Sequence, residues 1–457
     1  MEATVPDERP STAEGPATFR EVFAQSEFRA IFVAGTLSWI GDYVAKAAVT
    51  LLVYQQTKSV ALSATAFAVS FLPWLVGGPL LAALAERYPY RRVMVVCDVI
   101  RMLLMLVIAL PNLPTKAVLV LIFIATLANP PGQAARSALM PVILTGDRLA
   151  LGLSLNSSVG QAAQVVGYLF GATIAAIDPA VALLFNSATF ALSALLVRFG
   201  VRARPALMTA AHRSHLLRET GQGFRMVFGT TVLRAIAVLV YSAMFFSIVP
   251  EGLAAAWANK KPIDQLDPEI VQAIIMAANP VGFILGGLLV SRLFGPTRRL
   301  ALMRPLAVLA PLVLVPALFD PPPLVVAVLA LLCGFAVGGI MPTANVLFVQ
   351  ALPGAFRARA FGVMATGIQV IQGVAVLLTG VLAQRFGIPR VVGVWSAVGA
   401  LLMLLVVLRW PDRQTVDSAI TTASEANATP PAGPTTDDPA VDSDSWPGDG
   451  RRRHAVS

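Results

Sequence analysis

The sequence predicts an all-α membrane protein with twelve transmembrane helices, arranged as two pseudo-symmetric six-helix bundles. Three observations support this fold class. Of the 457 residues, 56% are hydrophobic and only 13% are charged, and the mean hydropathy is +0.74. Apolar runs of about 18 residues or more recur along the chain, and each run is long enough to cross a bilayer as a helix. Segments of the first half also have counterparts, in the same order, in the second half.

The candidate spans fall into two sets of six. They lie near residues 28–53, 60–85, 93–110, 117–140, 154–176, 180–198, 232–256, 269–291, 300–319, 323–349, 360–384 and 388–409. The polar segment FGVRARPALMTAAHRSHLLRETGQGFR separates the sets, and a Pro-, Thr- and Asp-rich stretch ends the chain. We therefore expect a cytoplasmic N-terminal segment (1–27), an N-terminal bundle (28–198), a cytoplasmic linker (199–231), a C-terminal bundle (232–410) and a disordered cytoplasmic tail (411–457).

Basic residues in the loops predict the orientation. With the N-terminus inside, the cytoplasmic segments hold sixteen of them and the opposite loops hold six. The sixteen are Arg87, Arg91, Arg92, Arg136, Arg148, Arg198, Arg202, Arg204, Arg213, Arg218, Arg225, Arg292, Arg298, Arg299, Arg357 and Arg359. The six are Lys58, Lys116, Lys260, Lys261, Arg385 and Arg390. We expect both termini in the cytoplasm and the protein in the cell membrane (inner or plasma membrane).

Several functional classes are disfavoured. The net charge of +9 is scattered among loops, so lipid headgroups of the bilayer, and not nucleic acid, are the expected partner. The cysteines Cys97 and Cys333 lie in separate apolar segments, and the three histidines form no zinc pattern. The sequence contains no GxxxxGK[ST] motif and no constellation typical of an enzyme, so neither ATP hydrolysis nor a cofactor is expected. Residues 1–27 lack the apolar core of a signal peptide.

Three sequence echoes relate the halves. GGPLLAALAERYPYRR (77–92) resembles GFILGGLLVSRLFGPTRR (282–299). The aligned residues are Arg87 with Arg292, Gln161 and Gln164 with Gln369 and Gln372, Pro130 with Pro342, and Pro141 with Pro353. Parallel six-helix repeats are a transporter architecture that places the substrate site between the halves near the middle of the membrane.

The segment WIGDYVAKAAV places two charges inside the first span. Asp42 lies about 21 Å along the helix from Phe28, and a central Asp costs about 2.5–3.5 kcal/mol on insertion scales, so it needs a partner or a water-filled cavity. Lys46 follows one turn later on the same face. Two interpretations stay open. Asp42 carries protons while Lys46 tunes its proton affinity, or the two form a permanent ion pair whose Lys46 end reaches the outer surface.

Glu251 is the third candidate for proton coupling. It follows Pro250 in the seventh span, the repeat counterpart of the first. A proline there frees a backbone carbonyl and bends the helix, which suits a cavity wall. The alternative is an acid at the outer membrane interface.

Other polar residues inside the spans are candidates for the substrate cavity. They are Trp39, Gln161, Gln164, Tyr168, Asn279, Asn345, Gln369 and Gln372. The glutamine pairs at i and i+3 each present one helix face. The alternative role is hydrogen bonding between helices, which contributes about 0.6 kcal/mol on average.

The stretch ALAERYPYRR resembles the loop between helices two and three of the major facilitator superfamily, whose pattern is roughly Gly-x-Leu-Ala-Asp-Arg-x-Gly-Arg-Arg. The departures are Ala82 for the first Gly, Glu86 for Asp, Pro89 for the second Gly and Tyr90 for an Arg. The segments VMVVCDVIR, GDYVAKAAVTLLVY, ARSALMPVI and FNSATF are similar to the drug- and macrolide-exporter branch, which also contains enterobactin exporters. The resemblance covers about 410 of the 457 residues.

The resemblance implies a conformational latch at the cytoplasmic helix ends. Glu86, Arg87 and Arg91 would form it, with Asp98 and Arg101 as partners, when the cavity faces outward. The alternative is that the arginines only follow the positive-inside bias. The branch also has a Gly-Pro-rich signature in helix five that is associated with antiport. Here GQAAQVVGYLFGA departs from it, with Tyr168 at the proline position.

We therefore expect a secondary active transporter, acting as a monomer, that exports a hydrophobic or amphipathic small molecule in exchange for protons by alternating access. The substrate would be a drug, a macrolide or a siderophore-like compound. One alternative is an importer or a lysophospholipid transporter of the same fold. A more distant one is a membrane sensor or scaffold that transports nothing, for which Asp42→Asn and Arg87→Ala would leave the phenotype intact.

Overall fold

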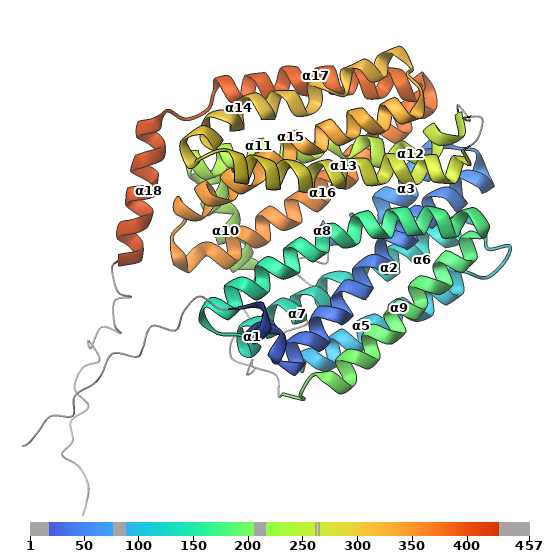
Figure 1. The fold of residues 1–457 in the computed structure, drawn as a ribbon, viewed down its shortest axis with the longest axis horizontal. Coiled ribbons are helices and arrows are strands. Elements are labelled where there is room, and N and C mark those ends of the chain that lie inside the picture. The colour runs from blue at the N-terminus through green and yellow to red at the C-terminus, as the bar shows by residue number, and fades with distance from the viewer. Residues whose placement is uncertain (1–17, 76–87, 205–215, 261–262, 264–265, 429–457) are drawn as a thin grey trace, which may run out of the picture.

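The structure is a computed structural model that describes residues 18–75, 88–204, 216–260, 263 and 266–428. Over these ranges it is helical, with one isolated β-bridge between Ile263 and Leu266. Figure 1 shows the helices as two groups lying side by side, one from each half of the chain.

The first group holds the helices up to residue 200. They are α1 (Phe19–Ala24), α2 (Ser26–Thr57), α3 (Val60–Val69), α5 (Tyr90–Ile108), α6 (Thr115–Leu127), α7 (Asn129–Ile143), α8 (Gly146–Ile177) and α9 (Pro179–Gly200). The second group follows the linker. It consists of α10 (Leu216–Gly229), α11 (Thr231–Ser247), α12 (Val249–Lys260), α13 (Pro268–Leu293), α14 (Pro296–Leu312), η2 (Val315–Phe319), α15 (Pro323–Gln350), η3 (Gly354–Phe356), α16 (Arg357–Phe386), α17 (Ile388–Leu408) and α18 (Arg413–Ala428).

Each predicted span coincides with a helix or a pair of consecutive helices, although the second can be followed only to Leu75. Ten helical segments of the described chain are long and apolar enough to cross a membrane, and Val60–Leu75 is a shorter apolar one. Helix α5 has the length of a span but carries Arg91, Arg92, Asp98 and Arg101. The prediction of an all-helical, multi-pass membrane protein is confirmed.

Prolines divide two of the spans into helix pairs. Helix α6 ends before Pro130 and Pro131, which start α7, and α11 ends at Ser247, just before Pro250 near the start of α12. Proline lacks the backbone N–H that would continue the helical ladder. The amide of Asn279 donates a hydrogen bond of 3.2 Å to the Ser247 carbonyl at the second break. The helix is therefore interrupted just before Pro250, and a side chain of α13 satisfies a carbonyl at the break.

The two halves pack together at the ends of the helices predicted to face outward. Gln272 on α13 donates a 3.0 Å hydrogen bond to the Ala47 carbonyl of α2. Ser59 and the backbone N–H of Ala61 both donate to the Gln384 side chain of α16, at 3.2 and 3.3 Å. We call these contacts the outer clasp. It consists of Ser59 and Ala61 with Gln384, and of Ala47 with Gln272.

The tail differs from the expectation. Residues 411–457 were expected to be disordered, but Arg413–Ala428 forms α18. Its Ala423 is buried, Ile420 packs against the core of the C-terminal half, and Asn427 accepts a 2.6 Å hydrogen bond from the Gly354 N–H. The polar composition hid this helix because its stability comes from docking and not from its own hydropathy. In Figure 1, α18 lies at the end of the molecule that also carries α1 and α10.

Candidate functional site

A cavity of about 300 Å³ lies between the two halves. Six of the predicted substrate-cavity residues line it, namely Gln161, Gln164, Tyr168, Asn279, Gln369 and Gln372. Two of the candidates for proton coupling, Lys46 and Glu251, line it as well. Apolar side chains such as Met244, Phe283 and Val337 complete the wall. The fold therefore brings residues from seven predicted spans into one cavity, called the central cavity below, which has amide, charged and apolar surfaces.

Glu251 is an acid inside the protein. Its residue is 2% exposed, and the Tyr168 hydroxyl donates a 3.0 Å hydrogen bond to its Oε2. Among the described residues, no Lys, Arg or His lies within ion-pair distance of this carboxyl group. The protein therefore encloses this carboxyl group, and the depth of Glu251 in the membrane stays a prediction. An ionised carboxylate without a cation is costly in such an environment, and protonation removes that cost.

Lys46 does not pair with Asp42, contrary to the expectation from their i, i+4 spacing. The Lys46 ammonium lies against aromatic rings, with its Nζ 4.3 Å from the ring centroid of Phe71, 5.0 Å from that of Tyr43 and 5.9 Å from that of Phe67. Cation–π contacts of this kind stabilise a desolvated ammonium by about 2 kcal/mol.

The partner of Asp42 comes from another helix. Asp42 forms a hydrogen-bonded ion pair with the guanidinium of Arg101 on α5, and the two side chains are 19% and 7% exposed. The Arg101 guanidinium also lies 4.1 Å from the ring centroid of Phe190 on α9. Arg101 reaches Asp42 because α2 and α5 both pack against α9. Its role as a latch partner stays a prediction.

A second cavity, of about 150 Å³, lies mainly inside the N-terminal half. The predicted residues Trp39, Asp42 and Lys46 line it together with Arg101 and Asn186. Lys46 and Gln369 line this N-terminal cavity and the central cavity alike. Tyr43 lines both cavities as well, so the first predicted span borders each of them.

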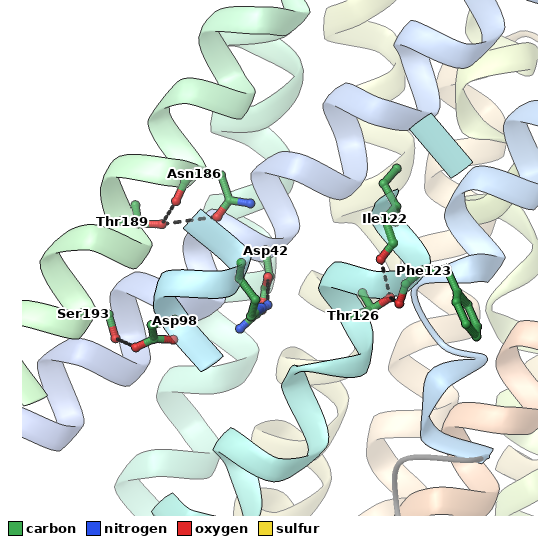
Figure 2. Close-up of polar contacts among 9 residues, drawn as sticks. Asp42, Asp98, Ile122, Phe123, Thr126, Asn186, Thr189 and Ser193 are labelled. Atoms are coloured by element: carbon green, nitrogen blue, oxygen red, sulfur yellow. Dashed lines mark hydrogen bonds and ion pairs between the residues drawn. The ribbon is translucent and has the colours of Figure 1, made fainter. Parts of the chain in front are cut away.

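Asp98 is buried beside the N-terminal cavity. It accepts a 2.7 Å hydrogen bond from the Ser193 hydroxyl of α9, as Figure 2 shows. Its own helix α5 places it two turns beyond Arg91, whose Nη1 donates a 3.2 Å hydrogen bond to the Val201 carbonyl. Asp98 and Arg91 are therefore held by different partners. Glu86 and Arg87 lie outside the described residues, so the latch predicted for them stays a prediction.

Arg136 was assigned to a cytoplasmic loop, but it lies within α7 and is 8% exposed. Its guanidinium lies 5.7 Å from the ring centroid of Trp39 and packs against Gly35, where a Cβ would collide with it. A small pocket of about 20 Å³, the size of one water molecule, joins Arg136 to Asp42 and Asp98. The position of Arg136 inside the fourth predicted span was the available signal, since a charge there needs a buried partner.

Two further positions differ from the sequence reading. Asn345 is exposed on α15 and lines none of the three cavities above, so it is not placed to contact substrate there. Asn186 on α9 lines the N-terminal cavity but was not selected as a site residue. Figure 2 shows its side-chain oxygen accepting a hydrogen bond of 3.3 Å from Thr189 one turn later.

Comparison with known proteins agrees with this architecture. The sequence matches the family described as the Major Facilitator Superfamily over residues 31–354 and 314–436. It is 26% identical over 379 residues to the multidrug efflux pump Tap of Mycolicibacterium fortuitum, covering 78% of this chain and 89% of that protein.

The fold is similar to those of solved transporters. The nucleoside transporter NupG aligns with a TM-score of 0.63 at 14% identity, covering 84% of this chain and 100% of that one. A transporter of the POT family aligns with a TM-score of 0.64 at 12% identity, covering 83% and 95%. The family consists of transporters and not of enzymes. The extent of the family match, together with the two packed helix groups, establishes that this chain is a multi-pass membrane protein of the major facilitator superfamily.

Proposed function

We propose that this transporter exports a hydrophobic or amphipathic small molecule in exchange for protons, and that Glu251 binds the coupled proton. The single observation that carries the proposal is the buried Glu251 carboxyl group in the wall of the central cavity, hydrogen-bonded to Tyr168 and without an ion-pair partner in the described structure. A carboxyl group that is stable when neutral and can reach water through a cavity is suited to carrying a proton. Asp42 is the weaker candidate because Arg101 already neutralises it.

The lining of the central cavity supports an amphipathic substrate. Gln161, Gln164, Gln369 and Gln372 supply amide groups from α8 and α16, while Met244, Phe283, Val337, Met341 and Ile368 supply an apolar surface. Largely apolar pockets with a few placed polar groups are typical of small-molecule sites. The printed name of the relative, a multidrug efflux pump, favours export of such compounds.

The energetics of a single proton suffice for modest export. One charge that moves down 100 mV supplies about 2.3 kcal/mol. At about 1.4 kcal/mol per tenfold, this sustains a substrate gradient of roughly fifty. We further propose that the protein is a monomer in the cell (inner or plasma) membrane, with both termini in the cytoplasm. Without Arg136, fifteen of the sixteen basic residues still support this orientation against six.

Accumulation in whole cells tests this function. Cells that express the wild type should accumulate less of a fluorescent cationic dye and of a labelled macrolide than cells with an empty vector, and an uncoupler should raise accumulation. Glu251→Gln should abolish the difference, because the amide cannot exchange the proton. Glu269→Gln, an acid at the start of α13, is the matched control and should behave as the wild type. Higher accumulation in expressing cells than in empty cells would instead indicate import.

A further inference from the structure

Lys46 occupies an aromatic cage formed by Tyr43 and by Phe67 and Phe71 of the second span. All three ring centroids lie within 6 Å of its Nζ, at 5.0, 5.9 and 4.3 Å. Several π faces around one positive charge are the arrangement that binds organic ammonium ions. Tyr43 and Phe71 also line the central cavity. A site with the size and chemistry of an alkylammonium group therefore borders the substrate cavity, and a side chain of the protein itself fills it.

A second position is available to the Lys46 ammonium. Asp42 is already paired with Arg101, whereas Glu251 has no cationic partner within ion-pair distance in the described residues. Lys46 and Glu251 line the same cavity. Glu251 is thus the acid toward which the ammonium can turn when it leaves the cage.

In the described part of the chain, no cation other than Lys46 lines the central cavity with Glu251. The titratable groups that interact with it are Lys46 and Tyr43 on α2, Tyr168 on α8 and Cys333 on α15. Helices α11, α13, α15 and α16 add amides and apolar side chains to the described lining of the central cavity, but no charge. The position of one ammonium group therefore sets the charge that Glu251 experiences.

We propose that Lys46 is a tethered competitor for the substrate. The ammonium group of an amphipathic organic cation displaces Lys46 from the cage, Lys46 turns to Glu251, and the carboxyl group releases its proton to water in the cavity. One positive charge enters the lining and one proton leaves it, so the total charge is unchanged. This step rests on the proposed function, and it adds a substrate class, organic ammonium ions, and a physical link between substrate binding and proton release.

The relay can be distinguished from direct competition. In direct competition, the substrate cation pairs with Glu251 itself, and Lys46 is not needed for proton release. In the relay, the outcome differs for a protein that lacks Lys46. A substrate ammonium in its cage takes the place that Lys46 has in the wild type, and no ammonium moves to Glu251. Glu251 therefore keeps its proton.

Proton release by purified full-length protein in detergent tests this difference. The probes are diphenylhexatriene that carries a trimethylammonium group and the uncharged parent compound, added in weakly buffered solution at pH 6.5. For the wild type, the charged probe should release about one proton per molecule bound and the neutral probe none. For Lys46→Met, the charged probe should bind about tenfold more tightly because the cage is empty, while proton release is lost. Lys46→Arg should restore release, since a guanidinium can also pair with Glu251.

Two further variants complete the test. Lys58→Met removes a lysine from the end of the same helix and should change neither binding nor release. Phe71→Leu added to Lys46→Met removes the nearest ring where no lysine competes for the cage. It should weaken binding of the charged probe about tenfold relative to Lys46→Met and leave the neutral probe unaffected.

Three results would overturn the relay. They are undiminished proton release in Lys46→Met, weaker binding of the charged probe in that variant, or binding that does not change when Phe71→Leu is added to Lys46→Met. Probe binding and proton release are measured at equilibrium without a gradient. A negative result here would therefore contradict the relay alone, whereas only the transport assays test proton-driven export.

Discussion

At the scale of single residues, the ion pair between Asp42 and Arg101 holds two helices of the N-terminal half together. Both side chains are largely buried, and Arg101 packs against Phe190 as well. Removing one member of a buried pair leaves the other charge uncompensated, whereas replacing both members by neutral residues avoids that penalty. We therefore propose that the pair has a structural role that can be separated from transport.

Stability measurements should show this coupling. Arg101→Met is expected to lower the free energy of unfolding in detergent by about 3–5 kcal/mol, and Asp42→Asn should also destabilise the protein. The double variant should be more stable than Arg101→Met alone. Thermal unfolding followed by scanning fluorimetry measures all three, and losses that simply add would contradict the coupling.

The same pair shows the limit of sequence reasoning at this scale. The sequence correctly indicated that Asp42 needs a partner, because the cost of a charge inside a membrane helix is a local property. The sequence indicated Lys46 as that partner because residue spacing reveals only neighbours on the same helix. The partner in the structure, Arg101, lies 59 positions away on α5, which packs with α2 against α9. Arg136 was misassigned for the same reason.

At the scale of elements, α13 and α15 approach each other closely along glycines. A Cβ at Gly282 would collide with the Leu331 backbone, one at Gly286 with the Phe335 backbone, and one at Gly338 with the Phe283 backbone. Small residues at such contacts let helix backbones meet inside a membrane, where the hydrophobic effect does not drive helix association. This contact fixes the position of Asn279, which reaches the break between α11 and α12.

A matched pair of alanine substitutions tests this helix contact. Gly286→Ala should lower the free energy of unfolding by about 1–3 kcal/mol, since the opposing atoms are backbone and cannot move aside alone. Gly287→Ala should have little effect, because its Cβ would meet only the Gly338 carbonyl at 3.5 Å, an ordinary contact distance. If both changes lowered the thermal stability equally, the close contact of α13 with α15 at Gly286 would be refuted.

Helix α18 gives a second prediction at this scale. Ile420→Asp places a charge against the core of the C-terminal half and should release the helix from its docked position. Trypsin should then cleave at Arg413 several times faster than in the wild type, since local unfolding exposes the site. Thr422→Ala, on the exposed face of the helix, is the control. Cleavage at the wild-type rate in Ile420→Asp would show that the helix does not depend on this contact.

The elements were the part of the fold most accessible from sequence. All twelve apolar runs correspond to helices or helix pairs as far as the structure describes them, because the need to satisfy backbone groups in lipid leaves helices as the only choice for such runs. Helix α18 was missed because docking, and not composition, stabilises it. The central cavity was anticipated from polar residues inside spans, but Asn345 shows that position in a span does not reveal which face a residue occupies.

At the scale of the whole molecule, the outer clasp joins the two halves at one end. Gln272 and Gln384 link α13 and α16 to the first span and the start of the second, and Gly380 packs directly on Ala64. Alternating access requires these contacts to separate once per cycle. Neutral hydrogen bonds of this kind contribute only about 0.5–1.5 kcal/mol each, so their separation is compatible with repeated opening.

A disulfide across the clasp should therefore stop transport. In a background with Cys97→Ala and Cys333→Ala, the pair Ala61→Cys and Gly380→Cys should form a disulfide, because a Cβ at residue 380 would lie 3.8 Å from the Ala61 Cα. Oxidation should abolish dye export and a reductant should restore it. Either single cysteine variant serves as the control, and full export in the oxidised double variant would contradict the need for this separation.

The central claim, that Glu251 carries the coupled proton, is tested most directly by comparing exchange with gradient-driven transport in proteoliposomes. The wild type should exchange labelled substrate across the membrane without a gradient and should accumulate it when a proton gradient is imposed. Glu251→Gln should retain exchange, because the cavity and the moving halves are intact, but should fail to accumulate substrate. Gradient-driven accumulation by Glu251→Gln at the wild-type level would contradict the claim and move the coupled proton to another group.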